Sequence, residues 1–159
     1  MSRLKEFRFC WADEWNNVEC GYDTILETTD SGNVYLQCLV NGKSQCIDLT
    51  GREDIFISDL EQCNIKDWDK KNYVNYDCLD GTRWRLSIAY DDASIRATGM
   101  NGYPKEFRQF IELLTVTWGL QKSYICIGEK SYFKNMIKDT VVEKMSSYTE
   151  TISSYSLYY

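Results

Sequence analysis

The stretch that decides the fold is TRWRLSIAYDDASIRAT, residues 82–98, in which apolar and polar side chains alternate on both sides of an acidic turn. The apolar positions share one face of an extended hairpin: Trp84, Leu86, Ile88 and Tyr90 before Asp91-Asp92, and Ile95 and Ala97 after it. A period of two residues is typical of a half-buried β-strand. Pairing the two strands places Arg96 opposite Ser87 and diagonal to Arg85. Arg83, Arg85 and Arg96 then share the other face.

The strand before this hairpin also alternates, with Val74, Tyr76 and Cys78 on one side and Asn75 and Asp77 on the other. A two-residue loop at Asp80-Gly81 would put the Asp77 carboxylate on the apolar face. A three-residue loop over 79–81 instead pairs Tyr76 with Trp84 and Asp77 with Arg83, which satisfies both faces. We therefore predict a hairpin in this second register.

The remaining residues up to position 80 read as short strands separated by turns. Alternation or β-rich composition predicts strands over 3–11, 22–29, 34–40 and 45–50. Asp30-Ser31-Gly32-Asn33 and Asn41-Gly42 are the turn signals between them. Ser58 followed by Glu61 has the spacing of a capping box, which predicts a short helix near 59–65.

The rest of the chain reads as helix. Pro104 favours a helix start, apolar residues recur at helical spacing after it, and Gly119 fits its end, so we predict a helix at 104–118. After a short strand at 123–127, apolar side chains from Phe133 to Tyr159 recur every three or four residues, which predicts a helix near 131–152. The expectation is one α+β domain, 1–159, with a single antiparallel sheet of six or seven strands packed by these two helices. Residues 146–159, rich in Ser, Thr and Tyr, would fray or bind a partner.

Composition excludes several activities. The 159 residues include no histidine, which removes Ser-His and Cys-His dyads and histidine-containing zinc sites. The seven cysteines are widely spread without a Cys-x-x-Cys pair, so we expect neither a metal site nor a cofactor, and mostly free core thiols. No phosphate-binding loop or catalytic motif is present, and we predict a protein that is not an enzyme. The start lacks a signal-peptide pattern and no apolar run could span a bilayer, which predicts a cytoplasmic protein that does not bind membranes.

The segment Trp84-x-Leu86-x-x-x-Tyr90 is followed by Gly99-x-Asn101-Gly102-Tyr103-Pro104-x-x-Phe107-x-x-Phe110. This pattern resembles a motif in small, largely uncharacterised proteins of Gram-positive bacteria and their mobile elements. The resemblance covers 84–110 and implies a β-hairpin packed by a helix, with no assigned function. Asn101 and Tyr103 would form an architectural corner, or would in addition contact a ligand.

Arg83, Arg85 and Arg96 are the sharpest candidates for ligand binding. Three guanidinium groups on one sheet face could hold a phosphate or carboxylate, which would make the protein a small-ligand or nucleotide-binding module. The alternative is a solvated face paired with Asp77 and other carboxylates. Trp84 and Tyr90 lie on the opposite face, which argues against a stacking platform for single-stranded nucleic acid.

The charge is uneven along the chain, with 16 acidic and 8 basic side chains in residues 1–80, although the whole chain carries a net charge of −6. Such a half repels nucleic acid and favours a basic protein partner. The candidate contact residues are Asp13, Glu14, Glu53, Asp54, Asp67 and Asp69 in the acidic half, and Tyr148, Ile152, Tyr155 and Tyr159 in the tail. The carboxylates could instead serve only solubility.

We expect a non-enzymatic inhibitor or immunity-type protein of bacterial or phage origin, which blocks a basic partner such as a nuclease, a defence complex or a toxin. A third interpretation is a structural subunit that forms a homodimer through the C-terminal helix.

Overall fold

The computed structural model of the protein describes residues 2–13, 21–77, 81–122 and 137–145. Eight strands run as β1 (Leu4–Asp13), β2 (Tyr22–Thr28), β3 (Val34–Val40), β4 (Lys43–Asp48), β5 (Lys71–Val74), β6 (Thr82–Tyr90), β7 (Ser94–Met100) and β8 (Val141–Lys144). The helical elements are α1 (Glu53–Gln62), the 3-10 turn η2 (Ile65–Trp68), α2 (Phe107–Glu112) and the π-helical turn η3 (Leu113–Thr117). Among these residues no helix has the length and apolarity needed to cross a membrane.

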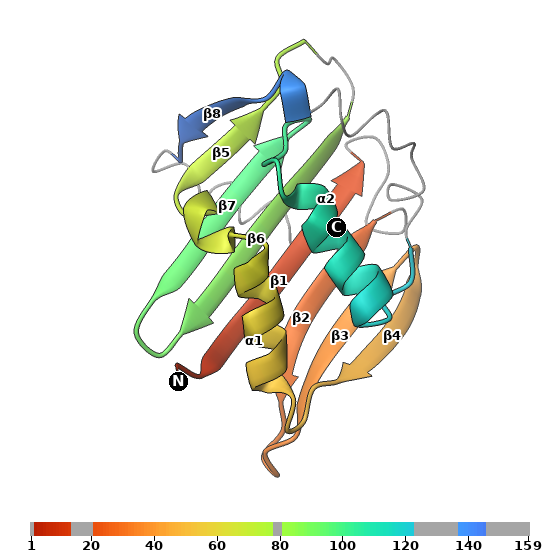
Figure 1. Cartoon of the computed structure of the whole chain (residues 1–159). Helices are drawn as coiled ribbons and strands as arrows, with labels where there is room; N and C mark the ends of the chain where they lie inside the picture. Colours follow the sequence, from red (N-terminus) through yellow and green to blue (C-terminus); the bar gives the residue numbers. More distant parts are fainter. Residues whose placement is uncertain (1, 14–20, 78–80, 123–136, 146–159) are drawn as a thin grey trace.

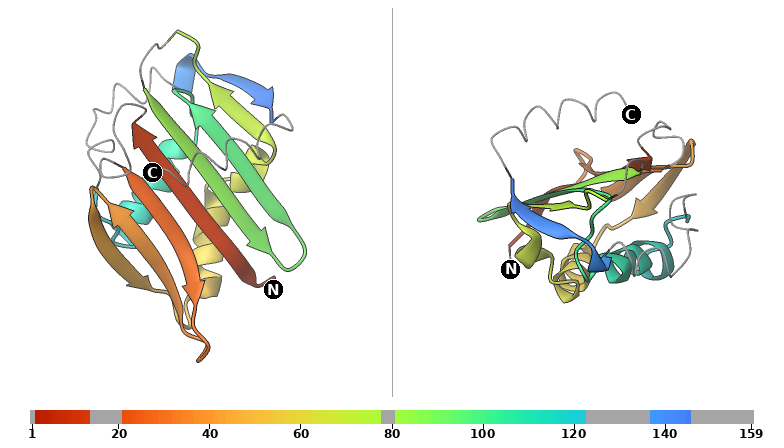
Figure 2. Two further views of the ribbon diagram at one scale, coloured as in Figure 1. Left: turned by 180° about the vertical axis from the view of Figure 1, so that it is seen from behind. Right: turned by 90° about the horizontal axis from the view of Figure 1, so that it is seen from above.

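All eight strands form one sheet in the order β4-β3-β2-β1-β6-β7-β5-β8. Its neighbours pair antiparallel except β5 and β7, which are parallel. The α+β class is confirmed in outline. The prediction of a purely antiparallel sheet of six or seven strands was wrong, because β5 joins through a crossover and β8 adds an edge. Figure 1 shows the sheet with α1 and α2 packed on one face, and the right view of Figure 2 shows the two layers edge-on.

The hairpin of residues 82–98 has the predicted register. Ser87 lies opposite Arg96 and Ile88 opposite Ile95, on either side of the Asp91-Asp92 turn. Trp84, Leu86 and Ile88 are buried beneath the helices. The four strands predicted in the first half of the chain also form, as β1–β4. Strands β2 and β3 make one local hairpin, and β3 and β4 make another.

The hairpin predicted between residues 74 and 84 was wrong. Both edges of β6 are taken, one by β1 and the other by β7, while β5 pairs with β7 and β8. Tyr76 therefore has no strand position opposite Trp84; it lies beyond the end of β5 with 65% of its surface exposed. Alternation determines which face a side chain takes, but it does not determine which strand lies alongside.

Two helix predictions also need correction. Helix α1 begins at Glu53, and Ser58 lies inside it rather than capping it, because Phe56, Ile57 and Leu60 form the buried face of one longer helix. The helix predicted over 131–152 does not continue through Val141–Lys144, which form β8 against β5. Val141 and Val142 are β-branched and half exposed at the sheet edge, so they are not part of a buried helical stripe. Residues 137–138 are helical, but residues 131–136 and 146–152 of that prediction and the strand at 123–127 lie outside the described residues.

An aromatic cluster joins the sheet to the helices. Phe107 of α2 packs edge-on against Trp11 of β1 at 5.3 Å between ring centres, and lies 5.0 Å from Trp84 of β6. Phe110, one turn further, meets Phe9 edge-on at 5.0 Å and Trp68 of η2 at 5.6 Å. The predicted helix at 104–118 is present as α2 and η3, with its apolar side on the core and Gly119 at its end with φ +81°, but it begins at Phe107 rather than at Pro104.

Candidate functional site

Helix α1 forms because its sequence places apolar side chains where the sheet needs cover. Phe56 meets Phe7 of β1 edge-on at 5.3 Å, and Ile57 and Leu60 continue the buried side. Gly51, with φ +72°, turns the chain into the helix after β4. Glu53 and Asp54 occupy the first turn, where negative charge interacts favourably with the helix dipole.

The outer side of α1 is acidic. Four of its ten residues are carboxylates (Glu53, Asp54, Asp59 and Glu61) and none is basic. Glu61 forms an exposed ion pair with Lys66 at 3.1 Å, and Asp59 accepts a hydrogen bond from Trp118. Among them stands Ile55, an aliphatic side chain with 55% of its surface exposed. An acidic helix with an exposed isoleucine has the composition of a contact surface for a basic partner.

The adjacent helical segment differs in charge. Arg108 and Glu112 of α2 form an ion pair at 3.1 Å, and Lys105 lies 3.7 Å from Glu106, so this segment is locally balanced. On η3, Val116 has 71% of its surface exposed. Most of the uncompensated negative charge of the described helical layer therefore belongs to α1, and Asp67 of η2 adds to it.

Trp118 fastens the two helical segments to each other. Its Nε1 donates a hydrogen bond to Asp59 Oδ2 at 3.0 Å, and its ring packs edge-on against Phe56 with 5.2 Å between centres. The Arg52 guanidinium lies 4.6 Å from the centre of the indole, within the range of a cation–π contact. Figure 1 shows α1 beside the end of the α2–η3 segment. Ile55 and Val116 thus belong to helices that are held together.

The structure brings the predicted arginine face together. Arg96 is paired with Ser87 and Arg85 with Thr98, so Arg85 and Arg96 are diagonal neighbours. They lie on the face of the sheet opposite the helices. Arg83 and Arg96 are exposed and Arg85 is half-buried. Arg83 and Arg85 each take part in an interaction within the chain.

The predicted pairing of Arg83 with Asp77 does not form. The register places Arg83 between Ala12 of β1 and Met100 of β7. The acidic groups of this sheet face include Asp23 and Glu6. Asp23 Oδ1 lies 3.5 Å from Arg8 Nε and accepts a hydrogen bond from the Cys10 thiol at 3.1 Å, and Glu6 accepts one from Ser87 at 3.0 Å. Cys10 itself is paired with Arg85.

Asn101 and Tyr103 form a buried corner. Asn101 is 2% exposed, and its Oδ1 accepts a hydrogen bond from the Thr82 backbone N–H at 2.9 Å. Tyr103 is 1% exposed, and its hydroxyl is hydrogen-bonded to the Thr82 side chain. Both side chains therefore act inside the fold, as the architectural interpretation of the motif expects. Their surfaces are not accessible to a ligand.

The other predicted contact residues are spread over the molecule. Glu53, Asp54 and Asp67 lie in the helical layer, whereas Asp69 accepts a hydrogen bond from the Arg96 backbone N–H at 2.9 Å and so supports β7. Asp13 ends β1. The residues Glu14, Tyr148, Ile152, Tyr155 and Tyr159 lie outside the described part of the chain.

Ile55 and Val116 were not identified from the sequence, although one signal was available. Ile55, Phe56 and Ile57 are consecutive, and a helix that lies on a sheet can turn only about two of three consecutive side chains toward it. Once the helix is known to begin at Glu53, one of the three must face outward.

Among the described residues three cysteines are buried and one is exposed, and all four are free thiols. Burial raises the pKa of Cys10, Cys38 and Cys63 to about 11, and nearby carboxylates, Asp23 and Asp59 among them, add to the effect. Cys46 is exposed on the edge strand β4. Within these residues no group of three or more Cys, Asp or Glu side chains is arranged to hold a metal ion.

Comparison with known proteins adds no relative. No protein-family model, curated protein sequence or solved structure matches the chain significantly. The resemblance of residues 84–110 to small proteins of Gram-positive bacteria therefore stays a prediction, and we infer the function from the surface of the molecule.

Proposed function

We propose that the protein is a non-catalytic binding protein that docks on a basic macromolecular partner through α1 and so blocks that partner. The observation that carries the proposal is the composition of this helix: four carboxylates, no basic side chain and an exposed Ile55. An inhibitor or immunity-type protein of a bacterium or phage would use such a surface against a nuclease, a defence complex or a toxin.

Electrostatics supports the first step of this binding. Complementary charge accelerates the encounter between two proteins and excludes partners of like charge. Glu53 and Asp54 form the first turn of α1, where Asp54 is exposed and Glu53 is half-buried. The net charge of −6 adds a long-range attraction toward cationic proteins.

Desolvation supports the second step. Exposed charge pairs contribute little affinity by themselves, and binding energy concentrates in a few apolar side chains that become buried at the centre of an interface. Ile55 and Val116, on helices fastened by Trp118, are the exposed aliphatic side chains that α1 and η3 present. A partner that contacts α1 would bury Ile55, whose neighbours in sequence are the carboxylates of Glu53 and Asp54.

The test uses two matched triple variants. The α1 variant carries Glu53→Gln, Asp54→Asn and Ile55→Ala. The control variant carries Glu27→Gln, Asp30→Asn and Ile25→Ala around the β2–β3 hairpin, where all three residues are exposed. Each variant removes two carboxylates and truncates one partly exposed isoleucine, so the change in net charge and the number of side-chain carbons removed are equal.

The wild-type chain and both variants serve as bait in lysate of the host cell, from about 50 mM to about 500 mM NaCl. We expect the wild type and the control to retain a basic protein that rising salt releases, and the α1 variant to lose at least about 90% of it, as loss of a binding hot spot predicts. Capture that ignores salt, equal loss from both variants, or retention of nucleic acid alone would each contradict the proposal.

The arginine face remains the second candidate. It is supported by the diagonal placement of Arg85 and Arg96 on the sheet face without α1 and α2. A ligand with a phosphate or carboxylate group would be held there by guanidinium hydrogen bonds. The double substitution Arg85→Ala and Arg96→Ala should then abolish binding of the ligand without loss of folding. Normal ligand binding by the double variant would exclude this function.

A further inference from the structure

A pocket of about 290 Å³ opens beside the turn between β6 and β7. Its walls come from four places: Ser2 before β1, one side of α1, the η2 segment with Asp69 after it, and the β6–β7 turn with the strand ends that flank it. Ile57 and Ile95 give it apolar walls and are almost fully buried. The pocket is separate from the arginine face and from the first turn of α1.

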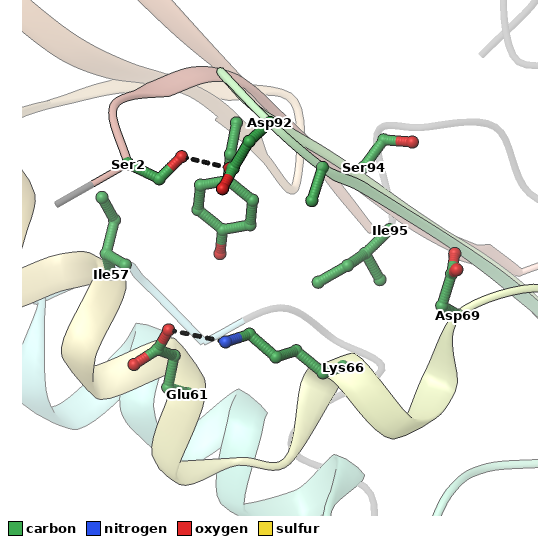
Figure 3. Close-up of a pocket in the computed structure, with 10 residues that line it drawn as sticks. Ser2, Ile57, Glu61, Lys66, Asp69, Asp92, Ser94 and Ile95 are labelled. Carbon is green, nitrogen blue, oxygen red and sulfur yellow. Dashed lines mark hydrogen bonds and ion pairs between the residues drawn. The ribbon is translucent and has the colours of Figure 1, made fainter.

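The rim of the pocket is acidic. Figure 3 shows Asp92 at the turn between β6 and β7 and Asp69 at the end of η2, with Ile95 between them and the Glu61–Lys66 ion pair across the opening. Asp92 Oδ1 accepts a hydrogen bond from Ser2, and Asp69 Oδ1 accepts one from the Arg96 backbone N–H. In each carboxylate the second oxygen remains an acceptor. Lys66 compensates Glu61, so the lining carries an excess of two negative charges.

Tyr90 supplies the observation that points to a ligand. It lines the pocket with only 9% of its surface exposed, and its hydroxyl is buried without a hydrogen-bond partner among the described residues. Burial raises the pKa of this phenol, and the charge of Glu61 raises it further, so the hydroxyl keeps its proton. An unpaired buried hydroxyl costs about 1–3 kcal/mol. Because the unpaired Tyr90 hydroxyl lies in a residue that lines the pocket, a bound group could form the missing hydrogen bond with it.

We propose that this pocket binds a small aliphatic amine, a di- or polyamine, whose ammonium groups pair with Asp92 and Asp69 and donate a hydrogen bond to the Tyr90 hydroxyl. The hydrocarbon stem of the amine lies along Ile57 and Ile95 between the two carboxylates. Two separated carboxylates with an apolar wall between them match two cationic groups joined by methylene groups. The two uncompensated carboxylates on the rim repel an anion, so we expect the pocket to exclude anionic ligands.

This inference does not depend on the proposed partner surface. Tyr90, Asp92 and Asp69 lie outside α1, and the carboxylates that the partner variant changes, Glu53 and Asp54, are not part of the pocket. A failure of one proposal therefore leaves the other unaffected.

The test is calorimetric titration of the full chain with spermidine and with putrescine at about 150 mM NaCl, where general surface attraction is screened. We expect saturable binding to one site. Tyr90→Phe and Asp92→Asn should each weaken binding about tenfold, the value of a hydrogen bond or ion pair to a charged group. Tyr90→Phe should also raise the unfolding temperature of the free protein, because it removes the unpaired hydroxyl and keeps the ring.

The matched control for charge is Glu27→Gln, an exposed carboxylate on the β2–β3 hairpin, which should leave the affinity for spermidine unchanged. The control ligands are 1,5-pentanediol, which keeps the stem without charge, and inorganic phosphate. Equal weakening by Glu27→Gln, unchanged binding by Tyr90→Phe, tight binding of the diol or of phosphate, or no binding of either amine would overturn the proposal.

Discussion

Trp84 covers Gly99 across the β6–β7 pair. The two residues lie directly opposite each other, and the Trp84 Nε1 donates a hydrogen bond to the Gly102 carbonyl at 2.8 Å. A Cβ atom built on Gly99 would stand 2.0 Å from that nitrogen, far inside contact distance. The indole therefore reaches its acceptor only because position 99 has no side chain. This accounts physically for the tryptophan and the glycine of the motif in residues 84–110.

Replacing this glycine should be severe. For Gly99→Ala we expect the free energy of unfolding to fall by roughly 3 kcal/mol, because the added methyl overpacks the site and displaces a buried hydrogen bond. Urea denaturation followed by tryptophan fluorescence measures it. Ser94→Ala, at an exposed position of the same strand, is the control and should change stability by less than about 0.5 kcal/mol. Equal midpoints for both variants would show that the indole can move aside.

Asn101 offers a sharper comparison. Its backbone is left-handed with φ +54°, and its Oδ1 accepts the hydrogen bond of the buried Thr82 N–H. Asn101→Ala loses the acceptor and also loses the preference of asparagine for the left-handed region while keeping a Cβ there, about 3 kcal/mol together. Asn101→Gly loses the acceptor but adopts the conformation freely, so it should be about 1 kcal/mol more stable than the alanine variant. Thermal unfolding gives the order, and an alanine variant at least as stable as the glycine variant would contradict it.

Much of the fold could be predicted because many of the pairings are local. In β2–β3, β3–β4 and β6–β7, a turn signal and two alternating runs contain the needed information within about 20 residues. The buried face of each of these strands could also be predicted, because alternation assigns Trp84 and Ile95 to the same side of the sheet whichever strands lie next to them. The arginine face was predictable for the same reason.

The parts that were missed depend on contacts distant in sequence. Strand β5 lies on the far side of β7 from β6 and runs parallel to β7, and no turn signal in the sequence predicts this placement. The short alternating run at 74–78 fits several neighbouring strands equally well. In β8, Val141 and Val142 belong to a spacing that also fits a helix, and only pairing with β5 decides. The pocket was invisible for a similar reason: Ser2, Glu61 and Asp92 meet only in the folded chain.

The cysteines of the described residues should differ in their rate of alkylation. With a pKa of about 11, Cys10, Cys38 and Cys63 hold roughly one thiolate in a thousand molecules at pH 8. Cys46 is exposed on β4. Iodoacetamide labelling resolved by peptide mass spectrometry should modify Cys46 at least about 100-fold faster than the three buried thiols. The difference should disappear in denaturant, and similar rates in the native protein would mean that the sheet opens on the time scale of labelling.

The last prediction concerns the side chain that fastens α1 to η3. Trp118→Phe keeps an aromatic ring against Phe56 but loses the hydrogen bond to Asp59, which should cost about 1 kcal/mol. Trp118→Ala leaves a cavity between the two helices and should cost about 3–5 kcal/mol. If α1 is the partner surface, the phenylalanine variant should retain the salt-sensitive partner almost unchanged. The alanine variant should lose part of it even at temperatures well below its unfolding transition, because Ile55 and Val116 are then no longer held in one arrangement. Stability measured by denaturant titration and partner retention measured on the same preparations separate the two effects. Equal retention of the partner by both variants would show that the partner contacts α1 and not η3.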